Sequence, residues 1–377
     1  MKVLISVVGR FHAFDLAKEL KKKSYLWKIN TTLPKFKARE WGLTNEEIKS
    51  NIFWEVLRRY FNKYLSKSFV EKNTFTSQAK SNYKLLKDAD VFIGWSGSSL
   101  EAIIKAKKMG KICILERGSS HYSYQMKILS VEYALFNKKF TPNKWMWERE
   151  LQEYELADYI SVPSTFVKKS FLQFGIPERK LIVNPYGVDL SRFTRTKKKD
   201  SKFRVISAGN FSIQKGSLYL LKAFAELNLE NSEFWHLGSI DSDMEDVIIK
   251  YRNEKVQFLG HKPQDELYNY YSQGSVFCLL SIQDGFGMVL TQAMSCGLPI
   301  ITSANTGGPD LILEQGQEGF VVNIRDTEQL KEYLMYLYNN PDVLEKMSFA
   351  AVNRVQSGFT WEDYGNRYYE FLKAITS

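Results

Sequence analysis

The chain has 377 residues, of which 44% are hydrophobic and 25% charged, a balance typical of soluble globular proteins and unlike that of a disordered chain. It contains no run of about 18 uncharged apolar residues, which argues against a membrane-spanning helix, and its N-terminal apolar stretch is too short for a signal peptide. The length predicts two domains. Cys113, Cys278 and Cys296 lie in apolar stretches, so we expect reduced core cysteines in a cytoplasmic protein.

The net charge of +10 is unevenly distributed along the chain. Residues 1–190 carry a net charge of +14, whereas residues 201–377 carry a net charge of −8. A basic half favours association with something anionic, such as a lipid surface, a phosphate-bearing acceptor or a nucleic acid. Because no RNP, helix-turn-helix or C2H2 pattern accompanies the charge, we expect no nucleic-acid partner.

Short apolar runs alternate with amphipathic stretches in chain order, which predicts parallel strands separated by crossover helices. Each half is therefore expected to form its own doubly wound α/β sheet, with a hinge near 197–201. The runs that predict strands are 2–8, 91–95, 111–115, 159–163 and 181–185 in the first half, and 204–209, 234–238, 256–260, 276–280, 298–302 and 320–322 in the second. Helices are predicted over 215–227, 264–273 and 327–338, and a final helix is predicted after Thr360 as N-cap.

The segment 54–72 has aromatic and basic residues at helical spacing and permits two interpretations. It could lie on an anionic membrane and deliver lipid-linked acceptors, or it could be a core-facing helix with a solvated basic side. The residues proposed for membrane or acceptor contact are Trp54, Arg58, Arg59, Phe61, Lys63 and Lys67.

Glycines follow several predicted strands, at the sheet edge where doubly wound folds bind ligands. Gly9 follows the first strand, and others in the second half are Gly209, Gly238 and Gly260. Lys215 and Gly216 stand at a predicted helix start. Lys215 could place its ammonium group on a diphosphate, or it could be a solvated lysine. The Walker A pattern is absent, which argues against a P-loop NTPase.

The segment SIQDGFGMVLTQAMSCGLPII is the most informative part of the chain. Gly285 and Gly287 allow a ligand to approach the backbone closely. Asp284 and Gln292 offer hydrogen bonds to sugar or ribose hydroxyls, although a turn aspartate and an exposed helical glutamine would give the same local pattern.

From about Asp158 to the end, the chain resembles the family 4 retaining glycosyltransferases of the GT-B fold. The matching pieces are ADYISVPSTFVKKSFLQFGIPERKLIVNPYGVDLSRF, the segment around Lys215-Gly216, VQFLGH, DGFGMVLTQAMSCGLPII, TGGPDLI, EGFVV and FTWEDYGNR. The resemblance implies two Rossmann-like domains that face each other across a cleft. Residues 1–195 would bind the acceptor, residues 196–358 would bind the nucleotide sugar, and the helix in residues 359–377 would return to the N-terminal domain.

The resemblance also implies roles for individual residues. The family's Glu-x7-Glu pair, which contacts the transferred sugar and the ribose, corresponds here to Asp284 and Gln292. Lys215 would bind the diphosphate, and Asn210 stands where the family usually has an Arg. ERGSSH looks like a family segment that makes His121 a candidate contact to the donor sugar, with His12 as a weaker second. The other implied donor contacts are Gly9, Gly216, Gly238, Gly260 near the base, Gly285, and the backbone N–H groups of Phe286, Gly287 and Met288.

The function expected from the resemblance is retaining transfer of a sugar from a UDP- or GDP-sugar to a hydroxyl of a saccharide or lipid-linked acceptor. His121, Lys215 and Asp284 are the expected catalytic residues. No cofactor or metal is expected, since neither an HExxH pattern nor a CxxC pair occurs and the resemblance implies metal independence. The expected place is the cytoplasm, at the inner face of the membrane, in polysaccharide or lipopolysaccharide assembly. The alternative is a catalytically weak subunit that binds nucleotide sugars or a partner transferase.

Overall fold

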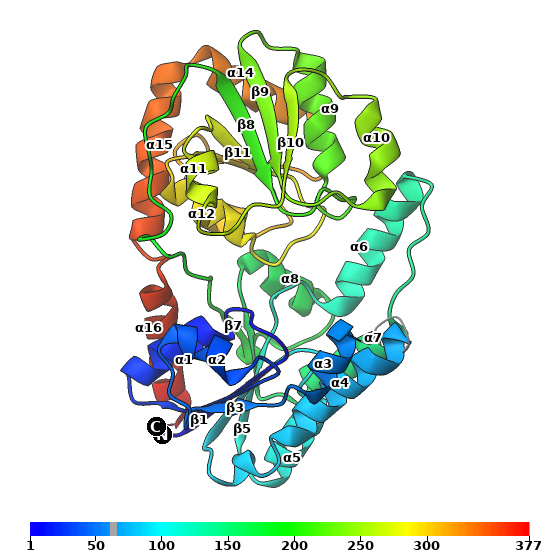
Figure 1. Ribbon diagram of the computed structural model, residues 1–377, viewed down its shortest axis with the longest axis vertical. Helices are drawn as coiled ribbons and strands as arrows, with labels where there is room; N and C mark the ends of the chain where they lie inside the picture. The colour runs from blue at the N-terminus through cyan, green and yellow to red at the C-terminus, as the bar shows by residue number, and fades with distance from the viewer. Residues whose placement is uncertain (61–65, 377) are drawn as a thin grey trace.

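The computed structural model describes residues 1–60 and 66–376, without the side chains of Arg58, Arg59 and Lys67. Within these residues the chain forms two parallel sheets, each covered by helices, which stack one above the other along the long axis (Figure 1). The expected α/β class with two doubly wound sheets is confirmed. No described helix is long and apolar enough to cross a membrane.

The N-terminal sheet has its described strands in the order β3-β2-β1-β4-β5-β6-β7, and all of them pair in parallel. The strands are β1 (Val3–Val7), β2 (Leu26–Thr31), β3 (Ile48–Ser50), β4 (Val91–Trp95), β5 (Ile112–Glu116), β6 (Tyr159–Val162) and β7 (Leu181–Val183). The helices of this half are α1 (Ala13–Lys22), α2 (Lys35–Ala38), η1 (Arg39–Trp41), α3 (Phe53–Tyr60), α4 (Lys67–Ser81), η2 (Leu85–Lys87), α5 (Leu100–Lys108), α6 (Tyr122–Leu135), α7 (Lys144–Leu156), α8 (Thr165–Gln173) and η3 (Glu178–Lys180).

The C-terminal sheet has its described strands in the order β10-β9-β8-β11-β12-β13, again all parallel. The strands are β8 (Phe203–Ala208), β9 (Ser232–Leu237), β10 (Val256–Gly260), β11 (Val276–Leu279), β12 (Ile300–Ser303) and β13 (Gly319–Val322). The helices are α9 (Ser217–Leu227), η4 (Ser242–Met244), α10 (Glu245–Ile249), α11 (Leu267–Tyr271), α12 (Met288–Ser295), α13 (Gly308–Leu311), α14 (Thr327–Asn339) and α15 (Pro341–Gln356).

The last helix, α16 (Trp361–Thr376), leaves the C-terminal half and packs against α1, so both chain ends lie together in the N-terminal half (Figure 1). Its start is fixed as the sequence predicts. The Asp363 N–H donates to Thr360 Oγ1 at 3.1 Å, and the Thr360 N–H donates to Asp363 Oδ2 at 2.9 Å. This reciprocal pair satisfies two N–H groups that a helix start otherwise leaves free.

Every strand predicted from an apolar run is present, and the predicted core cysteines are buried and free. Two strands were not predicted, β2 and β3. In β2 the first three residues are only partly buried, and β3 is a three-residue edge strand that contains an exposed lysine. Neither strand is a continuous apolar run: β3 is an edge strand with few neighbours to bury its side chains, and β2, which lies between β3 and β1, contains the polar residues Lys28 and Asn30.

The prediction of one continuous helix over 54–72 is wrong. Helix α4 begins at Lys67, after Ser66 in a non-helical conformation with φ −58° and ψ 128°. The Ser66 hydroxyl accepts a hydrogen bond from the Phe69 N–H at 3.3 Å, as an N-cap does. The aromatic and basic spacing is therefore divided between α3 and α4. Phe61 and Lys63 lie outside the described residues.

Candidate functional site

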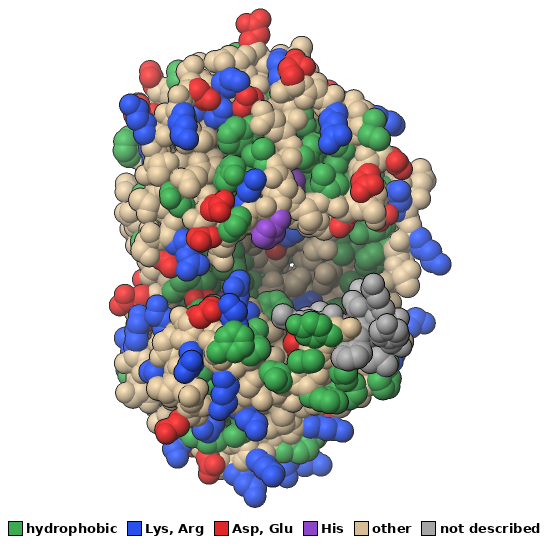
Figure 2. All heavy atoms as spheres, in the orientation of Figure 1, with side chains coloured by type: hydrophobic (Ala, Val, Ile, Leu, Met, Phe, Trp, Pro, Cys, Tyr) green, Lys and Arg blue, Asp and Glu red, His purple; other side chains and the backbone are tan. Residues whose placement is uncertain are grey.

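A cavity of about 2010 Å³ lies between the two halves, where the space-filling view shows a hollow (Figure 2). Its wall takes residues from the loop after β1, from η1, from the end of β5, from the linker after β7 and from α12 and α16. Both sheets thus direct strand ends or helix starts at one cleft, as in other doubly wound folds that bind ligands at such edges. Gly9 lies in this wall, and its N–H donates to Thr32 Oγ1 at 2.9 Å.

Lys215 and Asp284 are brought together although 69 residues separate them in the chain. Lys215 Nζ lies 2.5 Å from Asp284 Oδ2, and both side chains keep part of their surface exposed. Gly216 makes this approach possible: it has a φ of +61°, and a Cβ there would lie 2.0 Å from the carbonyl oxygen of Leu280. The two residues do not line the large cavity but form an ion pair beside it.

Helix α12 places Gln292 and Met288 in the cavity wall. The Gln292 side chain is 7% exposed, and its amide makes no hydrogen bond with a described residue. It is therefore not the exposed helical glutamine of the alternative interpretation. The first N–H groups of α12 have no partner within the helix and lie at its N-terminus, next to Gly287 with a φ of +78°.

The remaining predicted donor residues lie outside the cavity wall. Gly238 donates its N–H to the carbonyl of Gly260 at 3.0 Å, and a Cβ on Gly238 would lie 1.7 Å from the carbonyl oxygen of Gly209. Asn210 is held by neighbours, since its Nδ2 donates to Asp241 Oδ1 at 2.6 Å and its Oδ1 accepts from Ser239 Oγ at 2.9 Å. Its side chain is consequently occupied in this structure.

The loop that carries Asp284 touches the N-terminal half directly. The Gly285 carbonyl accepts a hydrogen bond from Ser164 Oγ at 2.6 Å, and Gln283 Oε1 accepts one from Ser120 Oγ at 2.9 Å. A Cβ on Gly285 would lie 1.9 Å from the carbonyl oxygen of Gly118. Gly285 therefore permits a close approach of the two halves and not only of a ligand.

The structure places His121 at the N-terminus of α6, outside the cavity wall, and its contact with a donor sugar stays a prediction. Its side chain does not line the cavity, is 3% exposed, and stacks on Phe174 with ring centroids 4.7 Å apart. Its Nδ1 accepts the Ser123 N–H at 3.2 Å, so the residue acts as the N-cap of α6. Burial, with a smaller contribution from Arg117, lowers the pKa of His121 to about 4.

This assignment predicts an acid-sensitive contribution to stability. Unfolded His121 has a pKa of 6.5 and folded His121 one of about 4, so its contribution is lost as the pH falls from 6.5 to 4. In His121→Asn, which keeps a capping side chain, we expect the loss of unfolding free energy over this range to shrink by about 2 kcal/mol. Urea denaturation at several pH values measures it, with the exposed His261→Asn as control. An unchanged pH dependence would contradict the assignment.

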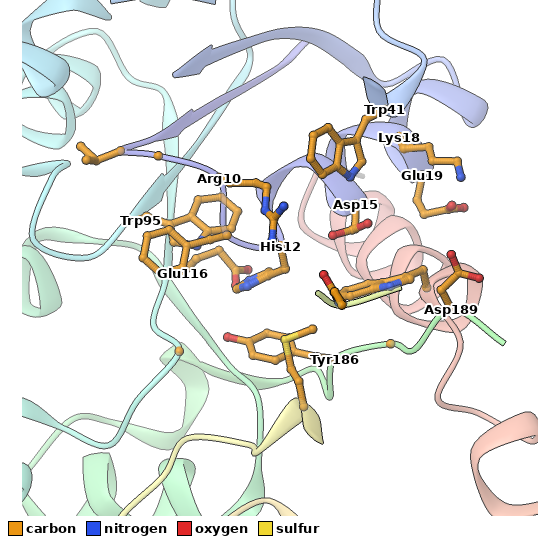
Figure 3. Close-up of a pocket in the computed structure, with 18 of the residues that line it drawn as sticks. Arg10, His12, Asp15, Lys18, Glu19, Trp41, Trp95, Glu116, Tyr186 and Asp189 are labelled. Carbon is orange, nitrogen blue, oxygen red and sulfur yellow. The ribbon is translucent and has the colours of Figure 1, made fainter. Parts of the chain in front are cut away.

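His12, the weaker sequence candidate, lies in the cavity wall instead (Figure 3). Its Nε2 lies 3.1 Å from Glu116 Oε2, and its ring packs on Tyr186 with centroids 4.1 Å apart. Asp15, one turn further along α1, also lines the cavity beside Trp41. Burial, opposed by the His12 and Trp41 side chains, raises the pKa of Asp15 to about 6.

A buried ion pair supports the same wall. Arg117 Nη1 lies 2.8 Å from Glu150 Oε2, and its guanidinium also donates to the Ser120 carbonyl at 3.0 Å from Nη2. Both residues line the cavity. Arg117 stands within the segment ERGSSH without a predicted role, and Asp15 and Tyr186 were not among the predicted site residues. Their positions shortly after β1, β5 and β7 could have indicated a site, because the carboxyl ends of these parallel strands meet at one edge of the N-terminal sheet.

Comparisons with known proteins match the C-terminal half to a family and the whole chain to solved structures. Residues 191–354 match the family described as Glycosyl transferases group 1. A probable sucrose-phosphate synthase of Thermosipho melanesiensis is 25% identical over 280 residues, which are 71% of this chain and 62% of that relative, so less than two thirds of its length is covered. The putative colanic acid biosynthesis glycosyltransferase WcaL of Salmonella typhimurium is 26% identical over 76% of this chain and 71% of its own.

Among solved structures, Anabaena Alr3699/HepE in complex with UDP superposes with a TM-score of 0.72 at 14% sequence identity. The superposition covers 99% of this chain and 100% of the other. At this identity the likeness concerns the fold, and it confirms the GT-B-like arrangement of the two sheets.

Proposed function

Because residues 191–354 form a Glycosyl transferases group 1 domain, we propose that the protein transfers a sugar from a nucleotide-diphosphate sugar to a hydroxyl of a saccharide or lipid-linked acceptor. The observation that carries the proposal is the cleft between two facing sheets, with Lys215 and Asp284 at the edge of the C-terminal sheet and Gln292 in its wall. The UDP named in the HepE complex makes a UDP-sugar the first donor to test. Colanic acid biosynthesis, named for WcaL, supports a place in polysaccharide assembly.

In this proposal the C-terminal half holds the donor. Asp284 contacts the transferred sugar, and Lys215 turns from Asp284 to the diphosphate, whose two phosphates carry more negative charge than one carboxylate. The N–H groups at Phe286, Gly287 and Met288 add donors at the start of α12. Since Lys215 and these N–H groups can offset the diphosphate charge, the proposal does not require a metal ion.

The chemistry proposed is the retaining route that the resemblance implies. The acceptor hydroxyl attacks the anomeric carbon on the face that the diphosphate leaves, so the new C–O bond forms as the old one breaks. The departing diphosphate takes the bonding electron pair, and one of its oxygens takes the hydroxyl proton. No protein nucleophile is needed, and Lys215 stabilises the charge that develops on the leaving group.

The ribose assignment of Gln292 makes a prediction about nucleotide affinity. Replacement Gln292→Ala removes an amide that can both donate to and accept from ribose hydroxyls. We expect UDP affinity to fall about five- to tenfold, the value of one or two hydrogen bonds. Calorimetric titration with UDP and 2′,3′-dideoxy-UDP measures this: the wild type should prefer UDP, and the variant should not. Equal preference in both proteins would contradict the assignment.

Membrane contact of the N-terminal half is part of the proposal and has its own test. The helices α3 and α4 expose the side chains of Phe53, Tyr60 and Phe69, which could enter the interface of an anionic membrane. We expect the double variant Phe53→Ser, Phe69→Ser to reduce co-sedimentation with anionic liposomes several-fold. Phe349→Ser, which removes an exposed aromatic ring from α15, is the matched control. Equal sedimentation of all three proteins would contradict membrane contact through α3 and α4.

One observation favours a second candidate function, that of a subunit which binds nucleotide sugars and transfers slowly. Asn210 replaces the arginine that the resemblance leads one to expect, and its side chain is bonded to Asp241 and Ser239. Donor binding without transfer to any of a wide range of acceptors would support this candidate.

A further inference from the structure

The N-terminal wall of the cleft contains polar groups whose hydrogen-bonding capacity the chain leaves unused. His12, Trp95, Glu116 and Tyr186 lie together in this wall, with Asp15 beside them (Figure 3). We refer to these five residues as the His12 wall. Their elements are the β1–α1 connection, α1 itself, the ends of β4 and β5, and the linker after β7.

The pairing of His12 fixes what this residue offers to the cleft. Its Nε2 lies 3.1 Å from a carboxylate oxygen of Glu116, which can only accept a hydrogen bond. In the neutral imidazole the proton is therefore on Nε2, and Nδ1 carries a lone pair. Nδ1 makes no hydrogen bond with a described residue, so the neutral form of His12 presents an acceptor.

Two neighbouring polar atoms are buried without a partner among the described residues, Trp95 Nε1 and the Tyr186 hydroxyl, while the Glu116 carboxylate also interacts with the Tyr368 hydroxyl. Trp95 and Tyr186 are each 6% exposed and Glu116 is 2% exposed. Buried polar atoms are paired in the great majority of cases, and leaving one unpaired costs about 1–3 kcal/mol. Their occurrence together, in the wall of one cavity, indicates a polar ligand that completes them.

The kinds of atom present select the ligand. The indole N–H of Trp95 donates, whereas the Glu116 carboxylate and His12 Nδ1 accept. A ligand hydroxyl can bond to either kind of group, because it both donates and accepts hydrogen bonds. A phosphate or carboxylate oxygen offers no donor, and it would meet the charge of Glu116. Of the charged described residues that line the cavity, nine are acidic and five are basic, so the basic character of the N-terminal half lies elsewhere.

From this arrangement we propose that the His12 wall is the subsite for an uncharged sugar ring of the acceptor. Hydroxyls of the ring bond to His12, Asp15, Glu116 and the Tyr186 hydroxyl, and the aromatic face of Trp95 covers its C–H surface. The inference rests on the proposed function, since it names the acceptor that the C-terminal half would glycosylate. The contact between Tyr186 and Phe286, with ring centroids 5.5 Å apart, joins the subsite to the loop that carries Asp284.

The test is saturation-transfer NMR on the full chain with simple sugars as probes. Methyl β-D-glucopyranoside and methyl β-D-galactopyranoside are the uncharged probes, and methyl β-D-glucuronide and galactose 6-phosphate are their charged counterparts. We expect the uncharged sugars to bind and the charged ones to bind at least about fivefold more weakly. Tighter binding of the charged sugars would overturn the proposal.

Two variants separate the wall from general binding to the cleft. Tyr186→Phe keeps the ring and removes the hydroxyl, and Asp15→Asn keeps the shape and removes the charge. Each should lower the affinity for the uncharged sugars about five- to tenfold, because each removes or weakens one hydrogen bond. Glu40→Gln, an exposed residue of the same cavity, should leave affinity unchanged. Wild-type affinity in both wall variants would overturn the assignment.

A parallel titration with UDP distinguishes this inference from the proposed function. Sugar binding that responds to the wall variants, in a protein that binds no nucleotide, would uphold the saccharide subsite while the donor assignment fails. Nucleotide binding that is unchanged by Tyr186→Phe, together with no binding of any sugar, would uphold the donor site and overturn the subsite.

Discussion

Replacement of Lys215 by Ala is expected to lower kcat for sugar transfer by about 100-fold or more, which corresponds to a loss of about 3–4 kcal/mol of transition-state stabilisation. In the structure the ammonium group is 2.5 Å from Asp284 Oδ2, next to the start of α9. A nucleotide diphosphate at this position would take over the cation, and charge builds on it as the sugar departs. The loss should therefore appear in kcat as well as in donor affinity.

The control for this variant is Lys222→Ala, which removes a lysine from α9 itself. Lys222 lies seven residues after Lys215 and forms an ion pair with Glu226 at 3.7 Å. Steady-state release of UDP from a UDP-sugar, followed in both variants, separates the role of Lys215 from general effects of charge. Wild-type turnover in Lys215→Ala would remove Lys215 from the catalytic site.

Replacement of Gly285 by Ala is expected to reduce transfer by about 100-fold, because displacement of reacting groups by about 1 Å can cost that much. The added Cβ would lie 1.9 Å from the carbonyl oxygen of Gly118 and 3.0 Å from Ser119 Cα, both in the backbone of the opposite half. Backbone cannot move aside as a flexible side chain can. The φ of Gly285 lies outside the left-handed region, so alanine meets no local strain and the effect acts across the cleft.

Two measurements test whether the added Cβ at Gly285 displaces the two halves of the molecule. Small-angle scattering should show a more extended molecule for Gly285→Ala, while UDP affinity, which depends on the C-terminal half, should change less than about threefold. A scattering curve and a transfer rate equal to those of the wild type would show that close approach at Gly285 is not needed for turnover.

The strands and the C-terminal site were largely predictable because the signals are local. Buried parallel strands are continuous apolar runs, and the loop from Asp284 to Gly287 combines glycines with a helix start within a few residues. The pairing of Lys215 with Asp284 could not be derived from spacing, since it depends on β8 and β11 being neighbours in the sheet. The resemblance to the glycosyltransferases, by contrast, implies one donor site for both residues.

The N-terminal site was much less predictable because its residues are distant in sequence. His12 and His121 both follow strand ends, and no local feature distinguishes them. The packing of their side chains distinguishes the two histidines. His121 is enclosed by Phe174 and other aromatic rings, whereas His12 lies in the cleft wall, where its contact with Glu116 orients the ring. In the same way, the aromatic spacing of 54–72 indicated a single helix, and the cap at Ser66 divides it.

Isothermal calorimetry of the wild-type protein with UDP and with GDP tests the central claim, which is a nucleotide-sugar site in the C-terminal half. The account predicts that one of them, with UDP expected first, binds in the micromolar range and that Lys215→Ala weakens it at least tenfold. The absence of binding by both nucleotides at millimolar concentration would contradict the donor site, and with it the proposed transfer of sugars.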